Sequence, residues 1–344
     1  MPKLSPLSGK KAIIAAATRS GTGEAYLITR ASLALAALFL SVAGAFAQYP
    51  QKPVKLLVPA APGGGTDVQA RYLASRLSAR LGQQFVIENV GTAGGNIAAA
   101  QAAKSDPDGY TLLMIAPATA INHSLYVHAG YDALKDFVEV AAWAQSPLLF
   151  IANPALPVSD LKSLADYSKS NPGKLAFGSG PGFINQMVME LYKIEAHANI
   201  LFVPYRGQAP ALTDVVSGQI QLTVDSIASS GQFVESNRVK ALAITSVQRV
   251  GAFPGVPTVA ESGFPKLTGN TWYGLLAPAK TPSNIISKLS AEVASIQAEP
   301  ESVKRIQAMG AEPFVSGSVE FTRYYQSEVA KWAEVIKASG LKIE

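Results

Sequence analysis

Residues 55–67 read KLLVPAAPGGGTD, and this stretch decides the fold class. It begins inside the short apolar run Val54–Val58, which is typical of a buried β-strand. The run breaks at a proline, passes three glycines and reaches Thr66 and Asp67, which are both good helix N-cap residues. Apolar residues then recur at helical spacing until Gly82 ends the pattern. The stretch therefore predicts a strand, a glycine-rich loop and the start of a helix.

A glycine-rich loop ahead of a helix N-terminus can bind an anion. Glycine lets a ligand come close to the backbone, and the amide N–H groups at the start of a helix favour negative charge. The candidate ligand contacts in this loop are Ala60, Gly64, Gly65, Thr66 and Asp67. An ordinary tight turn, in which Thr66 and Asp67 only cap the helix, accounts for the same residues. Both interpretations stay open at this point.

The first 47 residues look like a segment that directs export. Arg30 precedes the apolar stretch Ala31–Ala43, and a small-x-small cleavage signal follows at Ala45–Ala47. The stretch of 13 residues is too short to span a bilayer. We therefore expect residues 1–47 to be a signal peptide and Gln48 to be the first residue of the mature chain.

The mature chain would be nearly neutral. The full chain has 29 basic and 24 acidic residues, and the first 47 residues hold five of the former and one of the latter, which leaves 24 basic and 23 acidic residues. No basic run remains, so a nucleic-acid partner is not expected. The chain has no cysteine, which excludes a bacterial lipoprotein, since that class needs a lipidated cysteine at its mature start. We expect a soluble periplasmic protein.

Strands alternate with helices along the rest of the chain, which predicts an α/β protein with parallel sheets. Further strands are expected at 85–89, 110–116, 148–153, 175–180, 200–205, 220–225, 240–246 and 272–279. Helices are expected up to 104, over 159–170, up to 190, and over 209–216, 282–296, 300–309 and 318–339. The expected lobes are 48–148 together with 270–344, and 149–269. A cleft between two lobes is a preferred place for a small ligand.

Four segments rich in amides and hydroxyls are the candidate ligand loops: Gly63–Asp67, Gly91–Asn96, Ala116–Asn122 and Gly178–Phe183. None of them contains arginine or lysine, so a bound carboxylate would be held by neutral donors and helix dipoles. The candidate contacts in the last two segments are Ala118, Ser179, Gly182 and Phe183.

Residues for catalysis or metal binding are scarce. The chain has three histidines, His123, His128 and His197, and no HExxH pattern. The run Gly178–Gly180 lacks the G-x-S-x-G spacing of a nucleophile elbow, and no dinucleotide or phosphate loop is present. We therefore expect no enzyme, no metal and no cofactor, with an enzyme as the weakest alternative.

Eight segments spread over nearly the whole mature chain carry a family resemblance. They are 49–67 (YPQKPVKLLVPAAPGGGTD), 88–96 (ENVGTAGGN), 106–113 (DPDGYTLL), 131–137 (YDALKDF), 171–179 (NPGKLAFGS), 203–222 (VPYRGQAPALTDVVSGQIQL), 256–263 (VPTVAESG) and 272–282 (WYGLLAPAKTP). From Tyr49 to about Gly340 the chain resembles the Bug receptors, the periplasmic solute-binding proteins of tripartite tricarboxylate transporters.

The resemblance implies a two-lobed type II periplasmic-binding fold, each lobe a sheet flanked by helices, that closes on a small carboxylic acid. It places the first ligand loop at Ala60–Asp67, the second-lobe loop at Gly178–Gln186 and a family acid at Asp225. It further implies a monomer that delivers its ligand to the membrane subunits of the transporter. A periplasmic sensor that signals to a membrane partner is the alternative.

The chain departs from the family pattern at several positions. Ala60 stands where relatives often have an aromatic residue, Phe183 and Ile184 where they commonly have hydroxyls, and Gln186 where they have histidine. We therefore expect a monocarboxylate, or a dicarboxylate with an apolar spacer, in preference to citrate. Asp225 and Phe183 can also be read as structural residues, and Trp272 and Tyr273 are expected to pack in the core.

Overall fold

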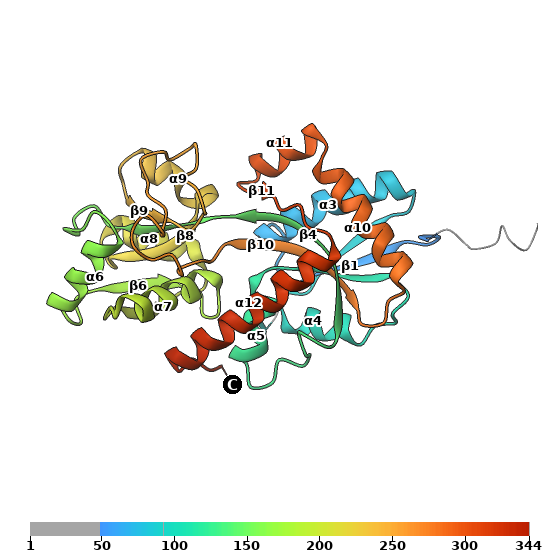
Figure 1. Cartoon of the computed structure of the whole chain (residues 1–344), viewed down its shortest axis with the longest axis horizontal. Helices are drawn as coiled ribbons and strands as arrows, with labels where there is room; N and C mark the ends of the chain where they lie inside the picture. Colours follow the sequence, from blue (N-terminus) through green and yellow to red (C-terminus); the bar gives the residue numbers. More distant parts are fainter. Residues whose placement is uncertain (1–48, 92, 344) are drawn as a thin grey trace, which may run out of the picture. The chain divides into compact units, whose positions relative to one another are not determined.

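The computed structural model describes residues 49–91 and 93–343 and divides the chain into two compact units, with the boundary after Gln51. The expected signal peptide, 1–47, lies outside the described residues. The description below concerns the second unit, from Lys52 onward (Figure 1).

The first sheet of this unit has six strands in the order β11-β4-β10-β3-β1-β2. Their bounds are Val54–Val58 (β1), Phe85–Asn89 (β2), Thr111–Ile115 (β3), Phe137–Ser146 (β4), Thr271–Pro278 (β10) and Glu312–Pro313 (β11). Strands β2 and β3 run parallel to β1, whereas β10 runs antiparallel to β3 and β4. The associated helices are Gly65–Leu81 (α3), Asn96–Ala103 (α4), Pro117–Leu125 (α5), Ser283–Gln297 (α10), Pro300–Ala308 (α11) and Ser318–Ser339 (α12).

The second sheet has five strands in the order β7-β6-β8-β5-β9. Their bounds are Leu148–Ala152 (β5), Ala176–Ser179 (β6), Leu201–Pro204 (β7), Leu222–Ser226 (β8) and Lys240–Ile244 (β9). Strands β7 and β8 run parallel to β6, and β5 runs antiparallel to β8 and β9. The helices are Leu161–Ser170 (α6), Ile184–Ala196 (α7), Gln208–Ser217 (α8) and Ile227–Glu235 (α9).

Local signals explain where several elements begin and end. The apolar residues of β1 are fully buried, as expected for a strand covered on both faces. Helix α3 ends at Gly82, which adopts the left-handed conformation at φ 69°. Helix α6 begins with a capping box in which Asp160 accepts a hydrogen bond from the Ser163 N–H and the Ser163 hydroxyl accepts one from the Asp160 N–H.

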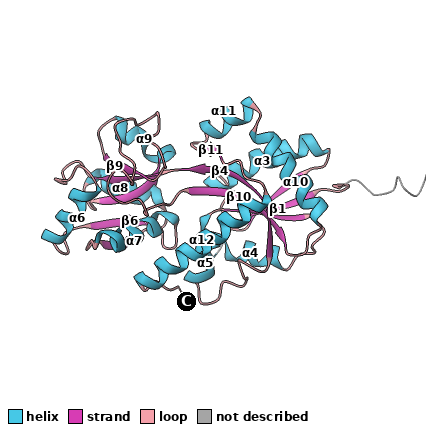
Figure 2. Ribbon diagram, in the orientation of Figure 1, coloured by secondary structure: helices cyan, strands magenta, loops and turns pink. Residues whose placement is uncertain are grey.

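The chain passes between the sheets twice, after β4 and before β10 (Figure 2). The Thr245 hydroxyl links the two crossings, because it accepts a hydrogen bond from the Leu148 N–H at 2.9 Å and lies 2.9 Å from the Asn270 side-chain oxygen. Helix α12 also spans the division, since it packs on α5 and β4 and on α7. Its Phe321 belongs to the core of the first sheet and its Trp332 to that of the second.

The two-lobed α/β fold expected from the sequence is confirmed, with three differences. The sheets are mixed, because β10 joins β3 antiparallel in the first sheet and β5 joins β8 antiparallel in the second. The outer strands β4, β11 and β9 add further antiparallel pairs, β4 with β10, β11 with β4 and β9 with β5. Residues Ala116–Asn122 are not a loop, because Pro117 begins α5 and proline suits the first helical position. Helix α9 and the strands β4 and β11 were not anticipated.

Candidate functional site

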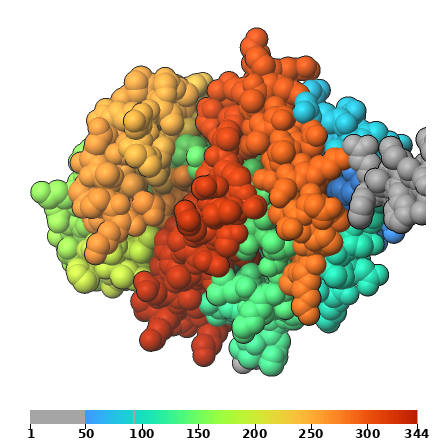
Figure 3. All heavy atoms as spheres, turned by 45° about the vertical axis from the view of Figure 1, so that its right-hand side comes forward, coloured from blue at the N-terminus to red at the C-terminus, as the bar shows by residue number. Residues whose placement is uncertain are grey.

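A cavity of about 560 Å³ is lined by residues from both sheets and their helices. The space-filling view shows a groove in the molecular surface between α9 and α11 (Figure 3). Residues at the start of α9 line the cavity, and α11 ends beside it at Met309. The volume lies within the usual range for small-molecule sites. The cavity is therefore the candidate ligand site.

Five helices begin at the wall of this cavity. These are α3, α5, α7, α8 and α9, which bring their N-cap or first helical residues Gly64, Ala116, Phe183, Gln208 and Ser226 to it. In none of the five does the N-cap side chain accept a hydrogen bond from a backbone N–H of its own helix. The first backbone N–H groups thus lack the usual capping partner, and the five dipoles add a positive potential. Of the described residues in the wall, none is lysine, arginine or histidine.

The first glycine-rich loop has the geometry of a backbone cradle. Gly63 adopts φ 81°, which favours glycine, whereas Gly64 is the extended N-cap of α3 at φ −69°. Gly64 N–H donates to the Ala61 carbonyl at 3.1 Å. The second loop lies directly against the first, since a Cβ on Gly91 would come within 2.7 Å of the Ala61 nitrogen. The two loops therefore support each other through backbone contact.

Asp67 holds this loop and does not line the cavity. The expectation that Thr66 and Asp67 cap α3 is wrong, because the helix begins at Gly65. Asp67 is 1% exposed and accepts hydrogen bonds from the Gly63 N–H at 2.8 Å, from Arg71 Nε at 2.9 Å and from the side chain of Asn89 at 2.8 Å. Burial raises the pKa of Asp67, but these hydrogen bonds outweigh burial and leave the pKa below its ordinary value.

Seven of the ten residues selected from the sequence line the cavity: Ala60, Gly64, Gly65, Thr66, Ala118, Phe183 and Asp225. Asp67, Ser179 and Gly182 do not. The buried Ser179 hydroxyl lies 3.3 Å from Gln208 Oε1, and the Gly182 N–H donates to Gln186 Oε1 at 2.8 Å. Both groups thus have protein partners, and their role as ligand contacts stays a prediction.

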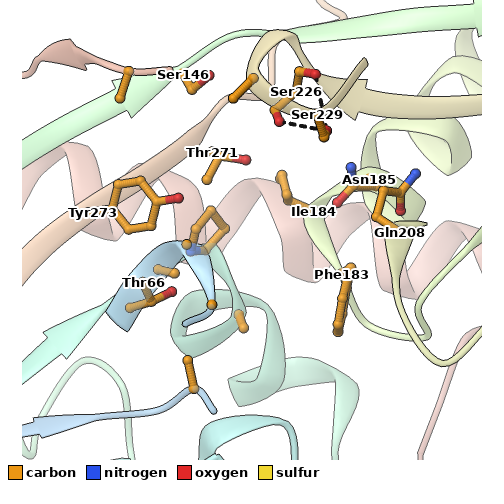
Figure 4. Close-up of a pocket in the computed structure, with 18 of the residues that line it drawn as sticks. Thr66, Ser146, Phe183, Ile184, Asn185, Gln208, Ser226, Ser229, Thr271 and Tyr273 are labelled. Carbon is orange, nitrogen blue, oxygen red and sulfur yellow. Dashed lines mark hydrogen bonds between the residues drawn. The ribbon is translucent and has the colours of Figure 1, made fainter. Parts of the chain in front are cut away.

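Several polar wall residues were missed by the sequence reasoning. They are Ser146, Asn185, Gln208, Ser226, Ser229, Thr271 and Tyr273, all labelled in Figure 4. Tyr273 was expected to pack in the core, but its hydroxyl points into the cavity (Figure 4). Burial raises the pKa of Tyr273 to about 12, so the hydroxyl stays a proton donor at neutral pH. Strand alternation could have found it, because the neighbouring Trp272 is fully buried and adjacent strand residues face opposite sides.

Asp225 lies at the end of β8 and is 4% exposed. Its Oδ1 accepts a hydrogen bond from the Ser226 N–H at 2.7 Å, whereas within the described part of the chain its Oδ2 has no hydrogen-bond partner. Burial raises the pKa of Asp225 to about 6, although Ser229 and the Ser226 N–H oppose that rise.

Metal ligands do not cluster: within residues 49–91 and 93–343 no three His, Cys, Asp or Glu side chains could hold an ion together. Over the same residues, the structure contains no helix with the length and apolar character needed to cross a bilayer.

Comparison with known proteins agrees with this fold. The chain is 33% identical to BugT of Bordetella pertussis over 320 residues, which cover 91% of this chain and 98% of BugT. The solved structure of R. palustris Rpa4515 with adipate is 34% identical to this chain, and the match covers 86% of this chain and 99% of the other, with a TM-score of 0.75. MatC from Rhodopseudomonas palustris with bound malate is 32% identical, covers 84% of this chain and 100% of its own, and gives a TM-score of 0.71.

Residues 69–341 match the family described as tripartite tricarboxylate transporter family receptor. The resemblance that the sequence segments carry is thereby confirmed, together with the expectation of a solute-binding receptor that is not an enzyme. This chain belongs to the receptor family of the tripartite tricarboxylate transporters.

Proposed function

We propose that the cavity binds a small organic acid through backbone amides at the helix N-termini. The observation that carries the proposal is the convergence of five helix N-termini, none with a backbone N–H capped by its N-cap side chain, on a wall whose described residues include no cationic side chain. Neutral donors can hold a carboxylate and still release it, as a delivering receptor requires. The relatives solved with adipate and malate support the same ligand class.

The apolar part of the wall favours a ligand with few charges. Leu148, Phe183, Ile184 and Met309 line the cavity, and Phe183 remains 43% exposed in it. Each additional buried carboxylate would need its own hydrogen-bond donors. Each Å² of apolar ligand surface that is buried instead makes the binding free energy more favourable by roughly 25 cal/mol. A monocarboxylate, or a dicarboxylate with an apolar spacer, therefore fits this wall better than citrate.

The receptor would act as a monomer that hands its ligand to the membrane subunits of a tripartite tricarboxylate transporter. Family membership supports this role. A sensor with the same fold would present its closed form to a signalling partner instead. Genes for two membrane subunits beside this one would favour transport, and a sensor kinase gene would favour signalling.

A panel of acids should separate these ligand classes by thermal shift. Hexanoate, benzoate and adipate should raise the melting temperature more than citrate, because each has fewer carboxylates that need hydrogen-bond donors in the cavity. A ligand at roughly 100 times its dissociation constant stabilises the folded state by about 2.7 kcal/mol, which corresponds to a shift of several degrees. Hexanamide and benzamide are the controls, since they have the same shape without the charge. A larger shift with citrate than with every other acid would contradict the apolar-wall argument.

We also propose that the protein is exported to the periplasm and is not a lipoprotein. The support is the series of Arg30, the apolar stretch Ala31–Ala43 and the signal Ala45–Ala47, together with the absence of cysteine. The intact mass of protein from the periplasmic fraction should equal that of a chain that begins at Gln48. Recovery in the cytosol of a chain that still contains residues 31–47 would contradict export.

A further inference from the structure

Asp225 is the only Asp or Glu among the described residues that line the cavity. It lies where α9 begins, beside a field that favours negative charge, and the Ser226 N–H at 2.7 Å already binds one of its oxygens. The second oxygen has no hydrogen-bond partner in the part of the chain that the structure describes. The carboxyl can therefore bind a proton on its second oxygen while the first keeps its bond to the Ser226 N–H.

The elements packed against Asp225 offer it no close charged partner. Strands β5 and β6 contain no ionisable side chain. On α7 the charged residues fall within 190–195, on α8 the only one is Asp214, and on α9 it is Glu235. Each comes six or more residues after the helix start at the cavity, which is about 9 Å or more along the axis.

Three other ionisable groups lie near this end of the second sheet or on the cavity wall. The Tyr205 hydroxyl donates to Asp214 at 2.6 Å and does not line the cavity. Arg206 follows β7, but its side chain is exposed and does not line the cavity. Tyr273 lines the cavity, but burial keeps it a neutral hydroxyl. None of the three supplies a positive charge at the cavity wall. A bound anion and an ionised Asp225 would therefore share one cavity without a cation between them.

Two negative charges in one enclosed site repel each other, which raises the pKa of both groups. The weaker acid of the two then binds a proton. We propose that Asp225 binds a proton when the receptor captures an anionic ligand, so that the neutral carboxyl is the form that admits the ligand. In the empty cavity the positive potential of the helix N-termini stabilises the ionised Asp225. In the complex the same potential stabilises the carboxylate of the ligand, and protonation of Asp225 removes the repulsion between the two groups.

The pH dependence follows from the sign of this coupling. Burial already raises the pKa of Asp225 to about 6, and a neighbouring anion raises it further. Affinity for an anion should therefore be level below the pKa of the empty protein. Above it, the affinity should fall by up to roughly tenfold for each pH unit until the pKa of the bound form is reached.

The test is calorimetry with the acid that gives the largest shift in the thermal panel. Titrations should run from about pH 6 to about pH 8.5, where the carboxylates of the ligand stay ionised. Buffers of different ionisation enthalpy report proton uptake directly, so wild-type protein alone can decide the question. Wild-type protein should bind the acid more weakly as the pH rises and should take up protons near neutral pH.

Asp225→Asn should bind the acid with an affinity that does not change with pH in this range, and without proton uptake. Glu139→Gln is the matched control, because Glu139 is also a buried acid whose pKa burial raises, but its carboxylate accepts a bond from the Thr322 hydroxyl and does not line the cavity. Glu139→Gln should keep the pH dependence of the wild-type protein.

The outcomes separate this inference from the proposed function on which it rests. If no carboxylate binds at any pH, the proposed function fails and the inference with it. Binding by wild-type protein without proton uptake overturns the inference alone. Proton release, with weaker binding as the pH falls, also overturns it, because Asp225 would then be ionised and would accept a hydrogen bond from a donor on the ligand.

Discussion

Gly91→Ala should weaken ligand binding by roughly tenfold or more, because the loss of a hydrogen bond to a charged ligand costs about 1.5–3 kcal/mol. A Cβ at this position would lie 2.7 Å from the Ala61 nitrogen and 2.8 Å from the Ala60 carbonyl carbon. These are backbone atoms, so no side-chain rotation relieves the overlap. The first glycine-rich loop must move away from the second, and its amides leave the positions they need to hold a carboxylate.

The same overlap should also lower the free energy of unfolding by about 1–3 kcal/mol, which is typical of overpacking. Urea denaturation and calorimetry with the best acid of the panel measure the two effects. Gly251→Ala is the control, since Gly251 has ordinary backbone angles and nothing lies within 4 Å of the added methyl. A folded Gly91→Ala protein with the affinity of Gly251→Ala would show that the loop does not form the ligand site.

The elements with strong local signals were predictable from the sequence. The strand, loop and helix from Val54 to Leu81 combine an apolar run, glycines and helical periodicity, and α12 has the predicted bounds Ser318–Ser339. Helix α9 was missed because IASSGQFVE contains a glycine and two serines, which are weak helix formers. Its first turn is marked by side-chain contacts that composition does not reveal, since the Ser230 hydroxyl donates to the Ser226 carbonyl at 2.7 Å and the Ser226 and Ser229 hydroxyls lie 3.0 Å apart.

The errors in the site follow from these errors in the fold. Ser226 and Ser229 were not candidates because no helix was expected to begin there, although both line the cavity. Asp67 has the residue type of a ligand contact, but its role depends on Asn89 and Arg71, which pair with it only in the folded chain. The position of Asp225 at a strand end could be predicted, whereas its unpaired oxygen depends on packing that a sequence pattern does not contain.

Gly310→Ala should act on the other side of the cavity, where the turn after α11 meets the start of α9. Gly310 has φ 75°, and a Cβ there would lie 2.2 Å from the Ala228 Cβ. Gly310 and Ala228 both line the cavity, and they come from elements attached to different sheets. The added methyl should therefore hold the two sides of the cavity apart and weaken acid binding by roughly tenfold or more, which corresponds to about 1.4 kcal/mol or more.

Two variants distinguish the effect of the contact with Ala228 from the effect of placing alanine in the left-handed conformation, which costs about 1–2 kcal/mol. Gly173→Ala carries the same strain at φ 74° with nothing within 4 Å of its methyl, so it should lose stability but keep its affinity for the acid. Ala228→Gly added to Gly310→Ala removes the opposing methyl and should restore part of the affinity, and the double variant compared with Gly310→Ala alone and Ala228→Gly alone gives the coupling between the two positions. Calorimetry on all five proteins, wild type included, measures these differences. If Gly310→Ala binds the acid as tightly as Gly173→Ala does, the two sides need not approach each other at this point when the ligand binds.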